Sequence, residues 1–198
     1  VNRRRINEEK EPANSIWPWS PGYRPVMQTF KQLYGIGKSA VISAVDVIRG
    51  IGVYAGMDGI SVEGATGRHD TNYEGKAQAA IRALQTHDFV YLHIEASDEA
   101  GHAGDAALKV RTIEDLDSRI IKPLFEVLSQ WDVPVTVAVL PDHPTPCALR
   151  THTDTPVPFL IYRPGLTPDR VTRYDEFSVQ CGQYPLLKDN EFIKEVLK

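Results

Sequence analysis

Hydrophobic runs of this sequence are bordered by acidic and imidazole side chains. Three runs have the composition of buried β-strands, namely residues 89–94, 135–140 and 157–162. The polar residues beside them are Asp98 and His102 after the first run, Asp142 and His143 after the second, and His152 before the third. Because loops at the carboxyl ends of parallel strands converge on one crevice, we expect these five side chains to meet at one edge of a sheet.

The chemistry of these side chains indicates a metal site. Carboxylate oxygen and neutral imidazole nitrogen suit divalent manganese and zinc, and they suit magnesium less well once nitrogen dominates. Asp142 and His143 are adjacent, so in an extended chain they point to opposite sides. One of them can therefore hold a metal while the other holds a second metal or a substrate group.

Each candidate also has a plainer explanation when it is taken singly. Asp98 can cap the following helix, and His102 can be a surface residue of a loop. Asp142 and His143 lie among prolines, so they can belong to a rigid turn without a ligand. The metal hypothesis gains its weight from three such positions falling at one predicted sheet edge.

Composition excludes several classes of protein. The 198 residues are enough for one domain with a substantial core. The net charge of −4 provides no basic field for nucleic acid or for an anionic membrane. No apolar run approaches the roughly 20 residues of a membrane helix, and two cysteines are too few for a disulfide framework. We expect a cytoplasmic protein without nucleic-acid or membrane partners and, because the chain begins with Val1, a piece of a longer protein.

Strand and helix patterns alternate along the chain. The strand patterns cover residues 39–47, 60–66, 88–95, 134–140 and 157–162. The helix patterns cover residues 25–34, 48–57, 73–87, 105–131 and 188–198. Pro123 should kink or split the longest helix, whereas Gly101 and Gly104 favour a tight loop around the first candidate ligands. This alternation predicts an α/β fold, a three-layer sandwich around a mostly parallel sheet.

Short motifs in a fixed order resemble one family over essentially the whole chain. They cover residues 13–17, 44–46, 64–67, 70–76, 95–102, 141–143, 151–153 and 156–159. Together they resemble the archaeal-type, cofactor-independent (2,3-bisphosphoglycerate-independent) phosphoglycerate mutases of the alkaline phosphatase superfamily. The resemblance implies an alkaline phosphatase-like fold and a metal-dependent interconversion of 2- and 3-phosphoglycerate through a phosphoenzyme.

The resemblance also implies how the candidate ligands are shared between two divalent ions, with Mn²⁺ preferred and Zn²⁺ or Mg²⁺ as alternatives. Asp98, His102 and His152 would hold one ion, and Asp142 and His143 would hold the second. In the family the second ion also takes an Asp and a Ser or Thr nucleophile from the N-terminal part of the protein. The resemblance assigns no such residues to this chain, so we expect its partner to be the N-terminal half of the same protein.

The resemblance also divides the chain into two parts and leaves three functions open. Residues 1–36 would be the tail of an inserted substrate domain, and residues 37–198 the C-terminal part of the metal-binding domain. Among the basic residues near the motifs, Arg49 and Lys76 are our candidates for binding the phosphoglycerate. The alternatives to a mutase are a related phosphatase or a phosphotransferase with another acceptor, such as a homoserine kinase, and an inactive metal-binding half-domain. We expect the isolated chain to be inactive.

Overall fold

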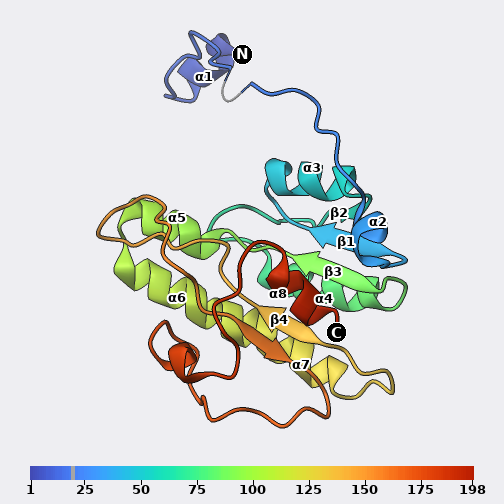
Figure 1. Cartoon of the computed structure of the whole chain (residues 1–198). Coiled ribbons are helices and arrows are strands. Elements are labelled where there is room, and N and C mark those ends of the chain that lie inside the picture. Colours follow the sequence, from blue (N-terminus) through green and yellow to red (C-terminus); the bar gives the residue numbers. More distant parts are fainter. Residues whose placement is uncertain (19–20) are drawn as a thin grey trace.

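The computed structural model describes residues 1–18 and 21–198 (Figure 1). Its centre is a parallel sheet of three strands in the order β2-β1-β3. The strands are β1 (Ser39–Ile42), β2 (Asp58–Ile60) and β3 (Phe89–Leu92). In the register of this sheet, Ala40 lies opposite both Asp58 and Val90. All three strands therefore end at the same edge, as the sequence predicts for a parallel sheet.

Helices cover both faces of this sheet. Helix α3 (Asp46–Tyr54) joins β1 to β2, and helix α4 (Tyr73–Leu84) joins β2 to β3. The two connections run in opposite directions across the sheet, so right-handed crossovers put α3 and α4 on opposite faces, as Figure 1 shows. The side chain of Asn72 caps α4 by accepting a hydrogen bond from the Gly75 amide at 2.8 Å.

The core lies between α4, the sheet and the long helical region. Its buried members include Ile42, Tyr73, Ala77, Ile120 and Leu124. The alanines of α4 let this helix approach its neighbours closely, and burying each larger aliphatic side chain contributes about 1.5–3 kcal/mol. This packing fixes the position of the strand ends that lead into the candidate site.

The long predicted helix is divided into several pieces. They are α6 (Ala106–Leu116), the π-helical segment η1 (Asp117–Ile121) and α7 (Lys122–Leu128), and a further helix, α5 (Ala96–Ala103), precedes them. The expected split near Pro123 is confirmed, because η1 ends one residue before α7 and the proline lies in the first turn of α7. A proline nitrogen donates no hydrogen bond, and the wider π turn accommodates that loss.

The loop expected around Asp98 was wrong, because residues 96–103 form helix α5. Gly101 does not break this helix. Instead, a Cβ atom at this position would collide with the carbonyl oxygen of Thr145, so glycine permits a close approach of α5 to the loop after β4. Gly104, with a φ of 72°, ends the helix in the left-handed conformation.

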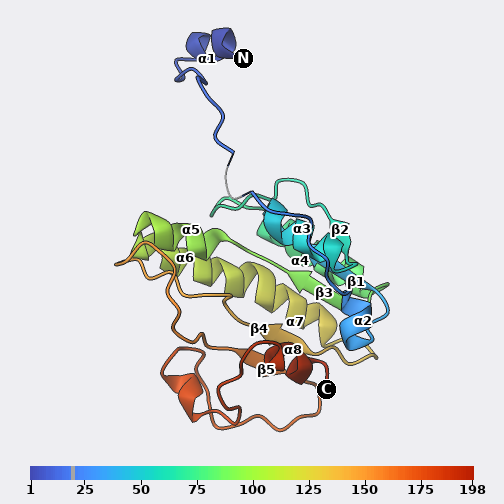
Figure 2. The ribbon, with the colours of Figure 1, turned by 45° about the horizontal axis from the view of Figure 1, so that its top comes forward.

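The last two strands form a separate antiparallel pair. They are β4 (Val137–Val139) and β5 (Leu160–Tyr162), shorter than the predicted runs. Figure 2 shows the pair beside α7, where the rings of Phe125 and Tyr162 lie 4.9 Å apart. A hydrophobic run carries no information on strand direction, which is why the sequence analysis placed both runs in the parallel sheet.

The remaining elements are short. They are α1 (Asn2–Asn7), α2 (Phe30–Tyr34), the 3-10 segment η2 (Ser178–Cys181) and α8 (Glu191–Val196). Helix α1 buries no residue. Positions 19 and 20 of the proposed 1–36 segment lie outside the described residues. No helix in the described part of the chain is long and apolar enough to cross a membrane.

Candidate metal centre

Helix α5 carries the first two candidate ligands on one face. Asp98 and His102 are four residues apart, so their side chains lie one turn from each other. The Oδ2 atom of Asp98 is 3.3 Å from Nε2 of His102. The Nδ1 atom of His102 lies 3.0 Å from the carbonyl oxygen of Arg150. A donor hydrogen on Nδ1 satisfies this carbonyl and leaves the Nε2 lone pair free for an ion.

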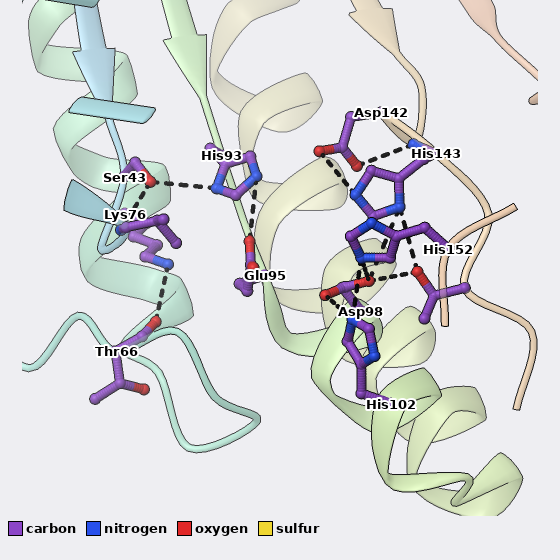
Figure 3. A network of polar contacts seen from close by, with 12 residues as sticks. Ser43, Thr66, Lys76, His93, Glu95, Asp98, His102, Asp142, His143 and His152 are labelled. Carbon is purple, nitrogen blue, oxygen red and sulfur yellow. Dashed lines mark hydrogen bonds and ion pairs between the residues drawn. The ribbon is translucent and has the colours of Figure 1, made fainter. Parts of the chain in front are cut away.

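His152 completes a group of three donors (Figure 3). Its Nε2 atom lies 3.0 Å from Nε2 of His102 and 3.5 Å from Oδ1 of Asp98. The ligand atoms of this group all lie within 4.8 Å of one another. Atoms that share one ion at about 2.0–2.2 Å are separated by about 3–3.6 Å. The spacing and the chemistry of the donors therefore fit one divalent metal ion.

The pair after β4 lies against this group. The His143 ring lies against the His152 ring, tilted by 30° with 3.7 Å between centroids, and its Nε2 atom is 3.5 Å from Oδ2 of Asp142. All five residues that the sequence singled out are thus brought together, as Figure 3 shows. Among the described residues, Asp142 and His143 belong to no group of three potential ligands.

A second acidic group shares Asp98. Glu95, Asp98 and Glu99 also have carboxylate oxygens within 4.8 Å of one another. Burial raises the pKa of Glu95, and the negative charges of Asp98 and Asp142 add to this effect. Glu95 and Glu99 border an open cavity of about 630 Å³ beside the donors, which Thr66 and Arg68 also line. The cavity borders the centre through Glu95 and Glu99, which share the second acidic group with Asp98.

A buried polar network lies on the other side of Glu95 (Figure 3). His93 contacts the hydroxyl of Ser43 at 3.2 Å through Nδ1 and the carboxylate of Glu95 at 3.4 Å through Nε2. The ammonium of Lys76 donates to the Thr66 carbonyl at 3.5 Å, a long contact, and this residue is 1% exposed. Burial lowers the pKa of Lys76, while the nearby charge of Glu95 opposes that shift. Lys76 was a candidate from the sequence, whereas the sequence pattern favoured a packed core role for His93 and gave no signal for Ser43.

Arg49 lies farther along the same sheet edge. It projects from α3, and its Nη2 atom donates to the hydroxyl of Ser61 at 3.1 Å, just past β2. Strand β2 is separated from β3 by β1, so this arginine is two strands away from the strand that leads to Asp98. Its buried Nε atom has no hydrogen-bond partner among the described residues. Arg49 therefore lies at the edge of the parallel sheet that leads to Asp98, without joining the cluster of five donors.

Sequence comparison agrees with this geometry. Residues 4–185 match the sequence model of the Metalloenzyme superfamily, a range that includes every candidate ligand. The chain belongs to the Metalloenzyme superfamily. Its carboxylate and imidazole donors come from helix α5 and from the segment between β4 and β5.

Relatives of this Metalloenzyme superfamily chain carry one name. A protein of Methanosarcina acetivorans called 2,3-bisphosphoglycerate-independent phosphoglycerate mutase is 52% identical over 199 residues, covering 100% of this chain and 50% of the relative. A protein of Methanothermobacter thermautotrophicus, called 2,3-bisphosphoglycerate-independent phosphoglycerate mutase 2, is 50% identical over 92% of this chain and 44% of its own length. The chain spans about half the length of the curated relatives it matches. The resemblance to this family is thus confirmed.

Solved structures show the same fold. A protein from Pyrococcus horikoshii aligns with a TM-score of 0.72 and 33% identity, covering 80% of this chain and 47% of the other. The cofactor-independent phosphoglycerate mutase from Thermoplasma acidophilum aligns with a TM-score of 0.62 and 26% identity, covering 93% and 42%. The predicted fold class is therefore confirmed, while the role of each candidate ligand stays a prediction.

Proposed function

We propose that this chain supplies the metal-ligand part of a cofactor-independent phosphoglycerate mutase, which interconverts 2- and 3-phosphoglycerate in glycolysis. The observation that carries the proposal is the convergence of Asp98, His102 and His152, with Asp142 and His143 packed against them. The likeness to proteins of that name over the whole chain supports the choice of reaction. We assign the protein to the cytoplasm, where this reaction would meet its substrates.

Each ligand has a proposed place. Asp98, His102 and His152 would hold one divalent ion, and Asp142 and His143 would hold a second one together with ligands from outside this chain. Two such ions would lower the pKa of an attacking hydroxyl and offset the charge of the transferred phosphoryl group. We keep Mn²⁺ as the preferred ion, with Zn²⁺ or Mg²⁺ as alternatives.

Two basic residues would hold the anionic substrate. Among the described residues, the buried ammonium of Lys76 has one hydrogen bond, a long one, so it can form a stronger contact with a carboxylate or phosphate that reaches the sheet edge. Arg49 offers a planar guanidinium whose Nε atom is still unpaired. Lys76 lies near Glu95, and Arg49 lies at the edge of the parallel sheet. Both would contact and orient the substrate anion, and neither would be a metal ligand.

The domain division remains part of the proposal. Residues 1–36 would belong to a substrate-binding insertion, and residues 37–198 to the metal-binding domain. The nucleophile would come from the N-terminal half of the same protein, so the 198-residue chain alone should be inactive. Asp142 and His143 form no group of three potential ligands among the described residues, which supports our expectation that the second ion needs ligands from outside this chain.

The test is an assay of the complete gene product with manganese supplied, following conversion of 3-phosphoglycerate to 2-phosphoglycerate. The wild-type protein should turn over, and Asp98→Asn should lose about 100-fold or more of the activity, the upper end of losses from weakened metal sites. Asp132→Asn, which removes an exposed carboxylate, is the matched control and should behave as wild type. Release of free phosphate, or transfer to another hydroxyl without mutase turnover, would replace this proposal by the phosphatase or phosphotransferase alternative.

A further inference from the structure

Thr145 lies where the two sets of candidate ligands meet. Its hydroxyl donates a short hydrogen bond to Oδ1 of Asp98, and the same oxygen is 3.3 Å from Nδ1 of His143. The residue is 3% exposed, so water does not compete for these contacts. One hydroxyl group therefore touches a member of each proposed metal set.

The hydrogen count determines the direction of both contacts. A hydroxyl has one hydrogen to donate, and Thr145 directs it to the carboxylate of Asp98. The threonine oxygen can then only accept from His143, which requires the hydrogen of that imidazole to be on Nδ1. The Nε2 atom of His143 is left with its lone pair, which is the form that binds a metal ion.

The backbone around Thr145 is fixed by contacts with helices α5 and α6 and with the loop that carries His152. Its carbonyl oxygen accepts a hydrogen bond of 2.6 Å from the ammonium of Lys109 on α6. The same carbonyl is packed against Gly101 of α5, where a Cβ atom has no room. The Thr153 amide donates to the carbonyl of Pro144 at 3.1 Å, which ties the loop that carries His152 to the same turn. The position of the hydroxyl is thus built into the fold.

We propose that Thr145 is a positioning residue that couples the two metal sets, by orienting the carboxylate of Asp98 and by selecting the tautomer of His143. This inference rests on the proposed metal centre and goes beyond it, because Thr145 itself binds no ion. Loss of the hydroxyl frees the Asp98 carboxylate to rotate and lets His143 take the other tautomer. Both ions are then bound less tightly, and partners of this kind are worth about 10–100-fold in metal affinity.

The experiment is a manganese titration of the complete gene product without substrate, following free Mn²⁺ by electron paramagnetic resonance. Thr145→Val keeps the shape of the side chain and removes the hydroxyl, whereas Thr145→Ser keeps the hydroxyl and removes the methyl group. Thr145→Val should weaken manganese binding about 10–100-fold, and Thr145→Ser should stay close to wild type. Equal affinities of Thr145→Val and wild type would overturn the proposal.

Further variants keep the test decisive. Thr145→Ala removes the hydroxyl without adding an apolar branch and serves if Thr145→Val does not fold. Failure of both to fold, with Thr145→Ser folded, would assign the hydroxyl to the fold instead of the metal and would also overturn the inference. If the wild-type protein binds no manganese, the proposed function fails at its metal centre. If it binds manganese and Thr145→Val binds equally, only the present inference fails.

Discussion

The Nε2 atoms of His102 and His152 lie 3.0 Å apart, although fifty residues separate them in the sequence. His102 comes from helix α5, and its Nδ1 atom contacts the carbonyl of Arg150, two residues before His152. This contact joins the helix to the loop and turns both imidazoles toward Asp98. Two imidazoles and a carboxylate that face one another at this spacing are the strongest local sign of a metal ion in the structure.

The first prediction concerns these two imidazoles. His152→Ala removes a proposed ligand and should weaken manganese binding at the first site by at least about tenfold. His69→Ala is the matched control, because His69 is an exposed imidazole in the loop before α4. Titration calorimetry with MnCl₂ compares the variants. Unchanged affinity in His152→Ala would remove this residue from the ligand set.

Gly101 provides a second prediction. In Gly101→Ala the new Cβ atom would overlap the Thr145 carbonyl oxygen, so α5 and the loop would have to separate. We expect a loss of stability of about 1–3 kcal/mol, as for other overpacked sites, together with weaker manganese binding. Urea unfolding measures the first effect. Gly50→Ala, at a helical glycine with open space around it, should instead stabilise the protein by about 0.5–1 kcal/mol.

The buried, charged ammonium of Lys76 should lower the free energy of unfolding at neutral pH. Burial lowers its pKa below the ordinary value of 10.5, so the unfolded chain binds this proton more tightly than the folded one. The penalty is complete below the folded pKa and disappears as the pH rises above 10.5. Lys76→Met should therefore raise stability at pH 8, by about 1–3 kcal/mol, and the gain should shrink toward pH 10.5 and above.

The same variant should lower mutase activity, because the proposed substrate contact is lost. Lys122→Met, at a side chain that is 68% exposed, is the control and should change neither property. Denaturant unfolding between pH 8 and pH 10.5 measures stability, and the activity assay measures mutase turnover. A Lys76→Met protein that is less stable at pH 8 would show that the ammonium supports the fold.

Arg49 gives a kinetic prediction. Arg49→Ala should lower kcat/KM for 3-phosphoglycerate about tenfold or more, since a charge-assisted contact contributes about 1.5–3 kcal/mol. Its manganese content should stay at the wild-type level, because Arg49 lies two strands away from the donors. Elemental analysis and steady-state kinetics on the same sample separate the two effects. Normal kinetics with normal metal content would exclude Arg49 from the substrate site.

The sequence predicted where the site lies better than how it is built. The runs before Asp98 and Asp142 both lead to the cluster, but β3 and β4 belong to separate sheets, so the expectation of a single sheet edge was wrong. The loop expected around Asp98 was wrong because Gly101 serves a close approach, and a glycine in a sequence does not tell a break from a contact.

Two further features had no signal in the sequence. Thr145 follows the candidate ligands within a proline-rich loop, and a threonine there carries no pattern that distinguishes a partner of Asp98 from an ordinary turn residue. The antiparallel pairing of β4 and β5 depends on tertiary contacts such as Phe125 with Tyr162, which a hydrophobic run does not encode.

The central claim is that this protein holds two metal ions through the five residues named from its sequence. Crystals of the complete gene product grown with MnCl₂ test it through anomalous diffraction at the manganese edge. We predict one peak about 2 Å from donor atoms of Asp98, His102 and His152. A second peak should lie beside Asp142 and His143, about 3.5–4 Å from the first. The absence of manganese at the first position, or an ion held by Glu95 and Glu99 without either histidine, would contradict the account.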